Sequence, residues 1–250
     1  MPRRMIVMNQ FEDRSVVVTG AGTGVGLAIA TGFVNEGAKV SFVGRRREKL
    51  EEAAANFPKD RVTIGPCDVS DRMAVNEMMA QVIDRFGAID ILVNNAGINT
   101  TPRSTGEVDP GDWDRIVDIN LNGVFNTVRA VLPKMREQKD GLIINISSIA
   151  GLRGSKLAGA AYAASKHGVV ALSQTLNEEE KDYNIRSCAI CPGEIDTPIL
   201  DQRPVPVSPE HRARILKVED LAAAALFVAA YPARVTIPIL VIKPTSQIFQ

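Results

Sequence analysis

The chain has 250 residues, of which 45% are hydrophobic and 23% are charged, and its 29 basic side chains balance its 29 acidic ones. This composition is typical of a folded chain with a sizeable core, and the zero net charge argues against nucleic acid or an anionic membrane as the main partner. The longest apolar run, residues 221–230, is half of the about 20 residues that a membrane-spanning helix needs. Residues 1–10 lack the apolar segment of a secretory signal, and three cysteines do not make a disulfide framework. We therefore predict a cytoplasmic globular protein.

Short apolar runs alternate with segments of helical periodicity along the whole chain. The run at residues 15–19 is β-branched and ends at a glycine cluster, which predicts a buried strand. Residues 24–35 have helical spacing, and Gly37 closes that helix. In chain order, we predict strand 15–19, helix 24–35, strand 39–43, helix 46–57, strand 62–64, helix 72–86, strand 89–93, helix 122–138, strand 142–146, helix 158–180, strand 185–190, helix 218–230 and strand 239–242.

Uniformly apolar strands separated by helices indicate right-handed crossovers and a parallel sheet with helices on both faces. The sequence shows no linker, internal repeat or low-complexity tract. We therefore predict a single α/β domain over residues 1–250, a doubly wound parallel sheet of the Rossmann type. The irregular stretches 97–111 and 193–209 both follow strands, so we expect them to form mobile loops at the edge where such sheets bind ligands.

A cluster of four glycines lies between the first predicted strand and helix, in the sequence Thr-Gly-Ala-Gly-Thr-Gly-Val-Gly at residues 19–26. Glycines let the backbone approach a pyrophosphate closely, and the first amides of the following helix attract an anion. A glycine-rich turn without a ligand is the alternative interpretation. The common G-x-G-x-x-G spacing is not met, because Val25 and Leu27 stand where a third glycine would be needed. The spacing that is met is T-G-x-x-x-G-x-G.

Tyr162 and Lys166 are four residues apart in a predicted helix, so they share one face. A free tyrosine has a pKa of about 10, which makes it a poor base at neutral pH. An ammonium about 4 Å away would contribute roughly 4 kcal/mol at an effective dielectric constant near 20, enough to lower the pKa by up to two or three units. We therefore expect Lys166 to lower the pKa of Tyr162 toward neutrality. The alternative is a solvent-exposed pair on a helix surface.

The chain resembles the short-chain dehydrogenase/reductase family over residues 15 to about 242. The glycine spacing is one of several segments that carry this resemblance, and they occur in the family's order. The others are Asn94-Asn-Ala-Gly97 after the fourth predicted strand; Asn120 in the next helical region; Asn145-Ile-Ser-Ser148 at the end of the fifth strand; Tyr162-Ala-Ala-Ser-Lys166 in the helix after it; and Pro192-Gly193 with Thr197 after the sixth. Each segment alone is weakly specific, but the ordered set is strongly specific.

The resemblance implies roles for four catalytic residues. Tyr162 would give a proton to a substrate carbonyl oxygen while a nicotinamide gives hydride to its carbon, and Ser148 would hydrogen-bond the same oxygen. Lys166 would also bind the nicotinamide ribose, and Asn120 would hold a water that relays protons. We favour Ser148 over Ser147 because side chains alternate along a strand, so the two should point in opposite directions.

The second predicted strand ends Phe42-Val-Gly-Arg-Arg-Arg47, without the acid that usually binds the ribose hydroxyls of NAD. Gly44 leaves room, and the Arg45 guanidinium suits a 2′-phosphate, with Arg46 as second choice. A solvated charge run at a helix start is the alternative. We therefore predict NADP(H) as the preferred cofactor, with NAD(H) possible. The resemblance, together with the glycine cluster and the two arginines, implies that the residues in contact with it are Thr19, Gly20, Thr23, Gly24, Val25, Gly26, Arg45, Arg46, Asp68, Val69, Asn95, Ala96, Gly97, Tyr162, Lys166, Pro192, Gly193, Ile195 and Thr197.

The predicted function is transfer of a hydride between NADP(H) and a small or medium carbonyl or alcohol substrate. An NAD-dependent alcohol dehydrogenase of the same fold and a dinucleotide-sensing protein without turnover are the alternatives. The resemblance implies a homodimer or homotetramer, with helices 122–138 and 158–180 pairing across a two-fold axis. The residues expected around the substrate are Asn99, Thr100, Arg103, Arg153, Leu157, Glu194 and the segment 199–207.

Other chemistry-bearing residues do not indicate a further site. Cys188 and Cys191 have metal or redox spacing, but they lie within or just beyond a predicted strand with no second pair, so we interpret them as structural. His167 and His211 are too few and too far apart for a metal site, and we predict none. Many members of the family end in a glycine-rich segment, whereas residues 237–246 here read Ile-Pro-Ile-Leu-Val-Ile-Lys-Pro-Thr-Ser. Pro238, at the start of a strand, fits an edge position.

Overall fold

Strands and helices alternate in the computed structural model, which describes residues 10–197, 200 and 207–247. In chain order, the elements are β1 (Ser15–Thr19), α1 (Gly24–Asn35), β2 (Lys39–Gly44), α2 (Arg47–Ala54), β3 (Val62–Pro66), α3 (Arg72–Phe86), β4 (Ile91–Asn94), α4 (Pro110–Val117), the π-helical turn η1 (Asp118–Asn122), α5 (Gly123–Gln138), β5 (Gly141–Ile146), the 3₁₀ turn η2 (Ile149–Gly151), α6 (Ala160–Glu179), the 3₁₀ turn η3 (Lys181–Tyr183), β6 (Ile185–Pro192), α7 (Pro209–Arg212), α8 (Val218–Ala229) and β7 (Ile239–Ile242).

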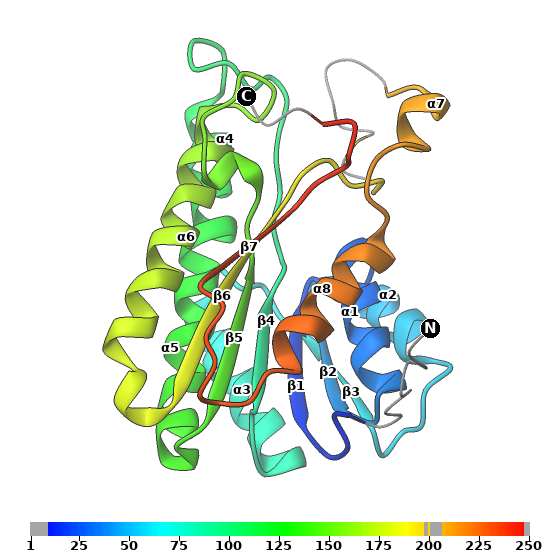
Figure 1. Ribbon diagram of the computed structural model, residues 1–250, viewed down its shortest axis with the longest axis vertical. Helices are drawn as coiled ribbons and strands as arrows, with labels where there is room; N and C mark the ends of the chain where they lie inside the picture. Colours follow the sequence, from blue (N-terminus) through cyan, green and yellow to red (C-terminus); the bar gives the residue numbers. More distant parts are fainter. Residues whose placement is uncertain (1–9, 198–199, 201–206, 248–250) are drawn as a thin grey trace, which may run out of the picture.

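The seven strands form one parallel sheet in the order β3-β2-β1-β4-β5-β6-β7. Helices α1, α2 and α8 cover one face, and α3, α5 and α6 cover the other (Figure 1). The order reverses direction between β1 and β4, which is where open parallel sheets bind ligands. The prediction of a single, doubly wound α/β domain is confirmed.

Two hydrophobic cores, one on each face of the sheet, explain why the strands are uniformly apolar. Val16 and Val18 of β1 belong to the core beneath α1 and α8, whereas Val17 belongs to the core beneath α3, α5 and α6. All three side chains are fully buried. Because successive side chains of a strand point to opposite faces, a strand covered on both sides has no solvent-facing position for a polar residue.

The long stretch before α5 differs from the sequence prediction. Residues 97–111 were expected to be irregular and the next helix to begin at 122, but α4, η1 and α5 follow one another without a break from Pro110 to Gln138. Asp109 caps α4 by accepting a hydrogen bond from the Gly111 amide, and Pro110 occupies the first turn, where its missing N–H is harmless. This Asp-Pro start signal was present in the sequence and was missed.

The start of α6 also differs, since the helix begins at Ala160 rather than 158. Gly159 immediately before it has a φ of +81°, which is not helical. A Cβ built on Gly159 would lie 2.6 Å from the Arg103 carbonyl oxygen, so only glycine lets these two segments approach so closely. The helix that carries Tyr162 and Lys166 therefore starts against the loop that carries Arg103.

A buried polar network joins β4, β5 and β6. The Asn94 amide donates to Asn145 Oδ1 at 2.9 Å, and Asn145 donates to Ser187 Oγ at 3.2 Å. Thr127 of α5 donates to Asn94 Oδ1 at 2.7 Å, and Ser173 of α6 shares a 2.7 Å hydrogen bond with Ser187. Buried polar groups need partners, so the network fixes the register of these strands and of the two helices above them.

β7 lies at the edge of the sheet, where Pro238 precedes it, as its sequence indicated. Across the described ranges, none of the helices combines the length and the apolar character that crossing a lipid bilayer requires.

Candidate active site

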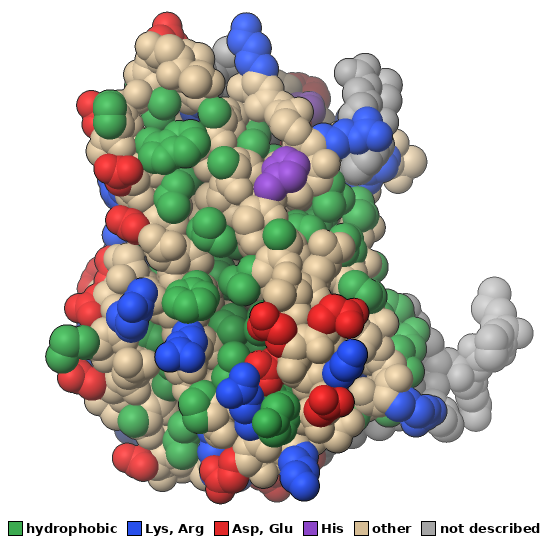
Figure 2. Space-filling model, turned by 90° about the vertical axis from the view of Figure 1, so that its left-hand side faces the viewer, with side chains coloured by type: hydrophobic (Ala, Val, Ile, Leu, Met, Phe, Trp, Pro, Cys, Tyr) green, Lys and Arg blue, Asp and Glu red, His purple; other side chains and the backbone are tan. Residues whose placement is uncertain are grey.

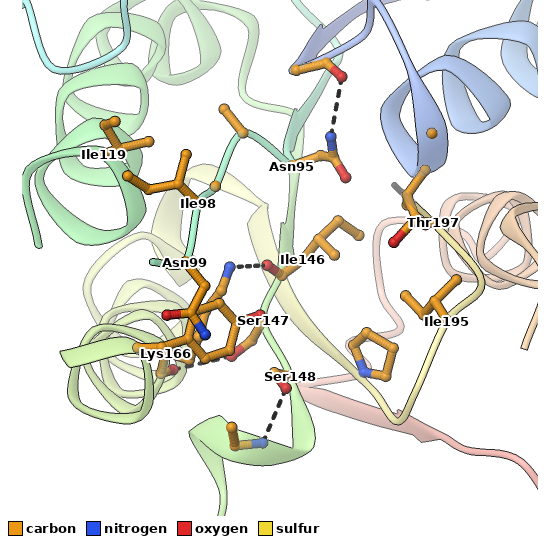
Figure 3. Close-up of a pocket in the computed structure, with 18 of the residues that line it drawn as sticks. Asn95, Ile98, Asn99, Ile119, Ile146, Ser147, Ser148, Lys166, Ile195 and Thr197 are labelled. Carbon is orange, nitrogen blue, oxygen red and sulfur yellow. Dashed lines mark hydrogen bonds between the residues drawn. The ribbon is translucent and has the colours of Figure 1, made fainter. Parts of the chain in front are cut away.

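A cleft of about 730 Å³ lies at the carboxyl ends of the strands, on both sides of the reversal point between β1 and β4. Figure 3 shows a close-up of it, with Asn95, Ser148 and Lys166 among the labelled residues. The predicted residues that line it are Gly20, Thr23, Gly24, Val25, Arg45, Arg46, Asp68, Val69, Asn95, Ala96, Gly97, Ser148, Tyr162, Lys166, Pro192, Gly193, Ile195 and Thr197. Thr19, Gly26 and Asn120 lie behind this lining and support it.

The loop between β1 and α1 brings main chain, rather than side chains, to the cleft surface. Gly20 and Gly24 have φ values of +66° and +59°. A Cβ on Gly26 would collide with the Gly20 carbonyl oxygen and with the Asn95 amide. Thr19 Oγ1 ties the loop to the end of β4 by accepting hydrogen bonds from the Asn95 and Ala96 amides at 3.0 and 3.1 Å.

The N-terminus of α1 has the character of an anion site. Its first turn contains no acidic residue, and within the described ranges the Thr23 side chain forms no capping hydrogen bond. The first amides and the positive end of the helix dipole therefore point toward the cleft. This closely packed glycine turn fits the pyrophosphate of a dinucleotide.

The end of β2 supplies cations to the same cleft. Arg45, Arg46 and Lys49 line it, and Arg45 Nη1 lies 3.9 Å from Asp68 Oδ2. Burial alone would raise the pKa of Asp68, but hydrogen bonds from Ser70 and the Arg45 charge hold it below its ordinary value. Half of the Arg45 side chain is exposed, so its guanidinium is accessible to a ligand at this end.

Lys166 lies in the wall of the cleft and is only 5% exposed. Its ammonium donates a 2.8 Å hydrogen bond to the Ile146 carbonyl oxygen (Figure 3). The same ammonium lies 5.7 Å from the centre of the Tyr162 ring. Burial lowers the pKa of Lys166 to about 8, because removing water disfavours the charged form.

The pKa of Tyr162 is shifted in the opposite direction from the expected one. Burial raises it, while hydrogen bonding with the Ser148 side chain and the charge of Arg103 oppose the increase. Among the described residues, Arg103 is the cation that acts on this phenol. The expectation that Lys166 lowers the pKa of Tyr162 was wrong, because the Lys166 ammonium donates its hydrogen bond to the Ile146 carbonyl and is itself easily deprotonated.

The two serines at the end of β5 point to different places. Ser147 is buried, and its hydroxyl donates to the Lys166 carbonyl oxygen at 3.0 Å. Ser148 lines the cleft, and its Oγ accepts a 3.1 Å hydrogen bond from the Ala150 amide (Figure 3). This alternation is the one expected from the strand pleat, with Ser148 on the side of Tyr162.

Asn120 is fully buried behind Gly97, in the π-helical turn η1. Its amide exchanges two hydrogen bonds with the Ile98 backbone, at 2.8 and 2.9 Å, and donates to Ser165 Oγ at 3.3 Å. A Cβ on Gly97 would lie 3.3 Å from Asn120 Oδ1 and 3.5 Å from Lys166 Nζ. Asn120 therefore supports the β4 loop next to the lysine.

Most residues expected around a substrate also line the cleft, namely Asn99, Arg103, Arg153, Leu157 and Glu194. Thr100 is absent from the described lining. Of the segment 199–207, Leu200 lines the cleft, whereas Val207 is not among the lining residues. Residues 199 and 201–206 lie outside the described residues. Glu194 Oε2 lies 2.5 Å from His211 Nε2, which ties the loop after β6 to α7.

Gln247 is a cleft residue that the sequence analysis missed. The chain after β7 folds over the end of β6, where Gly193 donates to the Ile242 carbonyl oxygen at 2.8 Å. Gln247 Oε1 accepts a 3.1 Å hydrogen bond from the Glu194 amide, and Lys243 Nζ donates to the Gln247 carbonyl oxygen at 2.6 Å. No motif marks these residues, because their position follows from the pairing of β6 with β7.

Cys188 and Cys191 are buried thiols in β6 that form no disulfide bond, as expected for residues with a structural role. Burial raises the pKa of Cys188 to about 12, so its thiol is poorly suited to act as a nucleophile. In the part of the chain that the structure describes, no group of three His, Cys, Asp or Glu side chains could hold a metal ion.

Comparison with known proteins identifies relatives over most of the chain. A family model described as short chain dehydrogenase matches residues 14–205. An uncharacterized oxidoreductase of Staphylococcus aureus strain MW2 is 36% identical over 95% of this chain and 100% of its own. A serine dehydrogenase solved with NADP⁺ is 33% identical, with a TM-score of 0.87 over 94% of this chain and 96% of that one. A 3-ketoacyl-(acyl-carrier-protein) reductase from Brucella melitensis, solved with NADH, is 32% identical, with a TM-score of 0.83 over 92% of this chain and 96% of that one.

The depressed pKa of Lys166 predicts how stability changes with pH. Between the folded pKa of about 8 and the ordinary value of 10.5, the unfolded chain binds this proton and the folded chain does not. In that window, the free energy of unfolding of the wild type should therefore rise relative to Lys166→Met, by up to about 1.4 kcal/mol per pH unit. Urea denaturation of both proteins at a series of pH values measures the difference, and a constant difference from pH 7 to 10.5 would contradict the assignment.

Proposed function

Because the chain belongs to the short-chain dehydrogenase/reductase family, we propose that it is an NADP(H)-dependent oxidoreductase that interconverts a small or medium carbonyl compound and its alcohol. The observation that carries this proposal is the position of Ser148 and Tyr162 in one cleft with the glycine turn of residues 19–26. A proton donor, a hydrogen-bonding hydroxyl and an anion-binding helix N-terminus are the groups that such a reaction needs.

The residues of the cleft have the chemistry to hold a dinucleotide. The amides at the start of α1 would bind the pyrophosphate, and Asp68, Val69 and Asn95 would surround the adenosine end. Pro192, Gly193 and Thr197 would contact the nicotinamide end. When bound, the nicotinamide supplies a hydride to the substrate carbon or accepts one from it.

Tyr162 and Ser148 would act on the substrate oxygen. Their hydroxyls would both hydrogen-bond it, which fixes the carbonyl and stabilises the negative charge that develops there. A raised pKa keeps the Tyr162 phenol protonated at neutral pH, so it is prepared to donate a proton in the direction of carbonyl reduction. Lys166, whose pKa is about 8, exchanges protons in the same pH range and would return the proton to the phenol together with Asn120 and a water.

The 2′-phosphate of NADP(H) would be recognised by Arg45, with Arg46 as a second contact. β2 ends without a carboxylate that would bind the ribose hydroxyls of NAD and repel a phosphate. Of the two solved relatives, the serine dehydrogenase is complexed with NADP⁺ and the ketoacyl reductase with NADH. The relatives therefore do not decide between NADP(H) and NAD(H), and the argument for the cofactor depends on this chain's own residues.

We expect Tyr162→Phe to lower kcat by about 10²–10⁴-fold, because the substitution removes the proton donor. The affinity for the dinucleotide, measured by fluorescence titration, should change by less than about threefold, since the ring is kept. Tyr183→Phe, at an exposed tyrosine outside the cleft, is the matched control and should keep wild-type turnover. Turnover that persists in Tyr162→Phe would exclude this tyrosine, and cofactor binding without turnover of any substrate in the wild type would favour a dinucleotide sensor.

We expect Arg45→Ala to raise the KM for NADPH by about 10–100-fold and to leave the KM for NADH nearly unchanged, since a charge-assisted hydrogen bond is lost only with the phosphorylated cofactor. Arg47→Ala is the control, because Arg47 is as exposed as Arg45 but pairs with Glu51 outside the cleft. A wild type that uses NADH better, together with an inert Arg45→Ala, would identify an NAD-dependent dehydrogenase instead.

We also propose that the chain forms a homodimer or homotetramer through α5 and α6. Figure 2 shows hydrophobic side chains gathered along the middle of the face that carries α4, α5 and α6. Phe125 of α5 is 42% exposed and Trp113 of α4 is 38% exposed. Light scattering should give a multiple of the 27.0 kDa chain mass for the wild type and a smaller assembly for Phe125→Glu, because a buried charge is costly at an apolar interface. A single-chain mass for the wild type would contradict the proposal.

A further inference from the structure

We propose that Gln247 is a positioning residue for the cofactor, because it holds the loop after β6 in the place that the nicotinamide half of a dinucleotide needs. The inference rests on the proposed function and adds a residue to the same site. It follows from the hydrogen bonds of Gln247, from the close packing around Gly193, and from the second support that the loop has on its other side.

The loop after β6, residues 193–197, forms part of the cleft wall. All of its residues except Asp196 line the cleft, and Ile195 and Thr197 lie across it from Lys166 (Figure 3). In the proposed function, this loop contacts the nicotinamide end of the cofactor. A shift of the loop would therefore change the contacts of the nicotinamide more than those of the phosphates, which would bind at the start of α1.

The segment after β7 holds this loop from one side. β7 pairs with β6, and the chain then continues beyond the carboxyl ends of the strands (Figure 1). The Gly193 amide donates to the Ile242 carbonyl oxygen at 2.8 Å, and the next amide, that of Glu194, donates to Gln247 Oε1 at 3.1 Å. Two successive amides of the loop are thus bound by one segment. Only the second of these hydrogen bonds depends on the identity of a side chain.

Gln247 is itself held in a turn. Its amide donates to the Pro244 carbonyl oxygen at 3.0 Å, and Lys243 Nζ donates to its carbonyl oxygen at 2.6 Å. A Cβ on Gly193 would collide with Gln247 Oε1 and would lie 2.9 Å from Pro244 Cδ, so the turn packs directly on the loop. Because the backbone of Gln247 is already fixed, its hydrogen bond to the loop does not have to order a free segment.

The loop has a second support on its other side, in the segment before α8. The Leu216 amide donates to the Glu194 carbonyl oxygen at 3.0 Å, and the Asp196 amide donates to the Leu216 carbonyl oxygen at 2.8 Å. The Asp196 carboxylate also lies 2.8 Å from Lys217 Nζ. The loop is thus held between two segments, and loss of the Gln247 carboxamide releases one side only. We therefore expect the loop to shift, rather than unfold, when this hydrogen bond is removed.

The test compares NADP⁺ with 2′-phospho-ADP-ribose, which is the same molecule without its nicotinamide, by isothermal titration calorimetry. Both ligands carry the phosphates, so the ratio of their dissociation constants measures the contribution of the nicotinamide. Gln247→Met keeps the length of the side chain but removes the acceptor, and it should weaken NADP⁺ binding by about three- to tenfold. Binding of 2′-phospho-ADP-ribose should change by less than about twofold. If the wild type prefers NAD(H), NAD⁺ and ADP-ribose make the same comparison.

Three further variants separate positioning from a general disturbance of the cleft. Gln247→Glu keeps an acceptor for the Glu194 amide, so it should keep the wild-type ratio of the two dissociation constants. Lys243→Met loosens the turn without removing the acceptor, and it should change the ratio in the same direction as Gln247→Met but by less. Gln81→Glu, at an exposed glutamine of α3 outside the cleft, is the matched control and should bind both ligands like the wild type.

An unchanged ratio in Gln247→Met, or equal weakening of both ligands, would overturn the proposal, as would a Gln247→Glu variant that behaves like Gln247→Met. Where Gln247→Met does not fold, Lys243→Met decides by the same criterion. The proposed function fails separately. A wild type that binds neither NADP⁺ nor NAD⁺ refutes the dinucleotide site itself, whereas a wild type that binds and turns over one of them, with variants of unchanged ratio, refutes only the role of Gln247.

Discussion

The exclusion of water around Lys166 and Tyr162 is the constraint on which the rest of the site depends. Burial disfavours the charged form of both groups, so it lowers the pKa of the lysine to about 8 and raises that of the tyrosine. The two pKa values, ordinarily 10.0 for the phenol and 10.5 for the amine, therefore move apart, so that the buried phenol keeps its proton while the buried amine loses its own more easily. The Ile146 carbonyl, 2.8 Å from Lys166 Nζ, keeps the amine in place when it is charged.

This arrangement requires strand ends that do not move. The hydrogen bonds that join Asn94, Asn145 and Ser187 cross three strands, and Thr127 and Ser173 extend them to α5 and α6. Each of these groups would lose a partner if a strand slipped by one residue, so the network fixes the register as well as adding stability. The same strands carry the Asn95 and Ser148 side chains into the cleft.

The sequence predicted the sheet, its helices and most of the cleft lining, because alternating apolar periodicities and ordered short motifs are local signals. It missed α4, although Asp109 and Pro110 form a recognisable helix start. It also assigned the wrong cation to Tyr162, since spacing along a helix shows that two side chains share a face but not where each polar end is directed. The place of Gln247 in the cleft could not be predicted from the sequence, because only the pairing of β6 with β7 brings that residue to Gly193.

The charges that line the cleft differ from the overall charge of the chain. The whole chain has as many acidic as basic side chains, which argued against an anionic macromolecule as partner. Within the described residues, however, six basic side chains and two acidic ones line the cleft: Arg45, Arg46, Lys49, Arg103, Arg153 and Lys166 against Asp68 and Glu194. Three of the basic groups lie near the glycine turn and three near Tyr162, so the excess extends over both ends. On the proposed function, a dinucleotide phosphate would account for the first group, whereas the second group lies in the part of the cleft that the substrate would occupy.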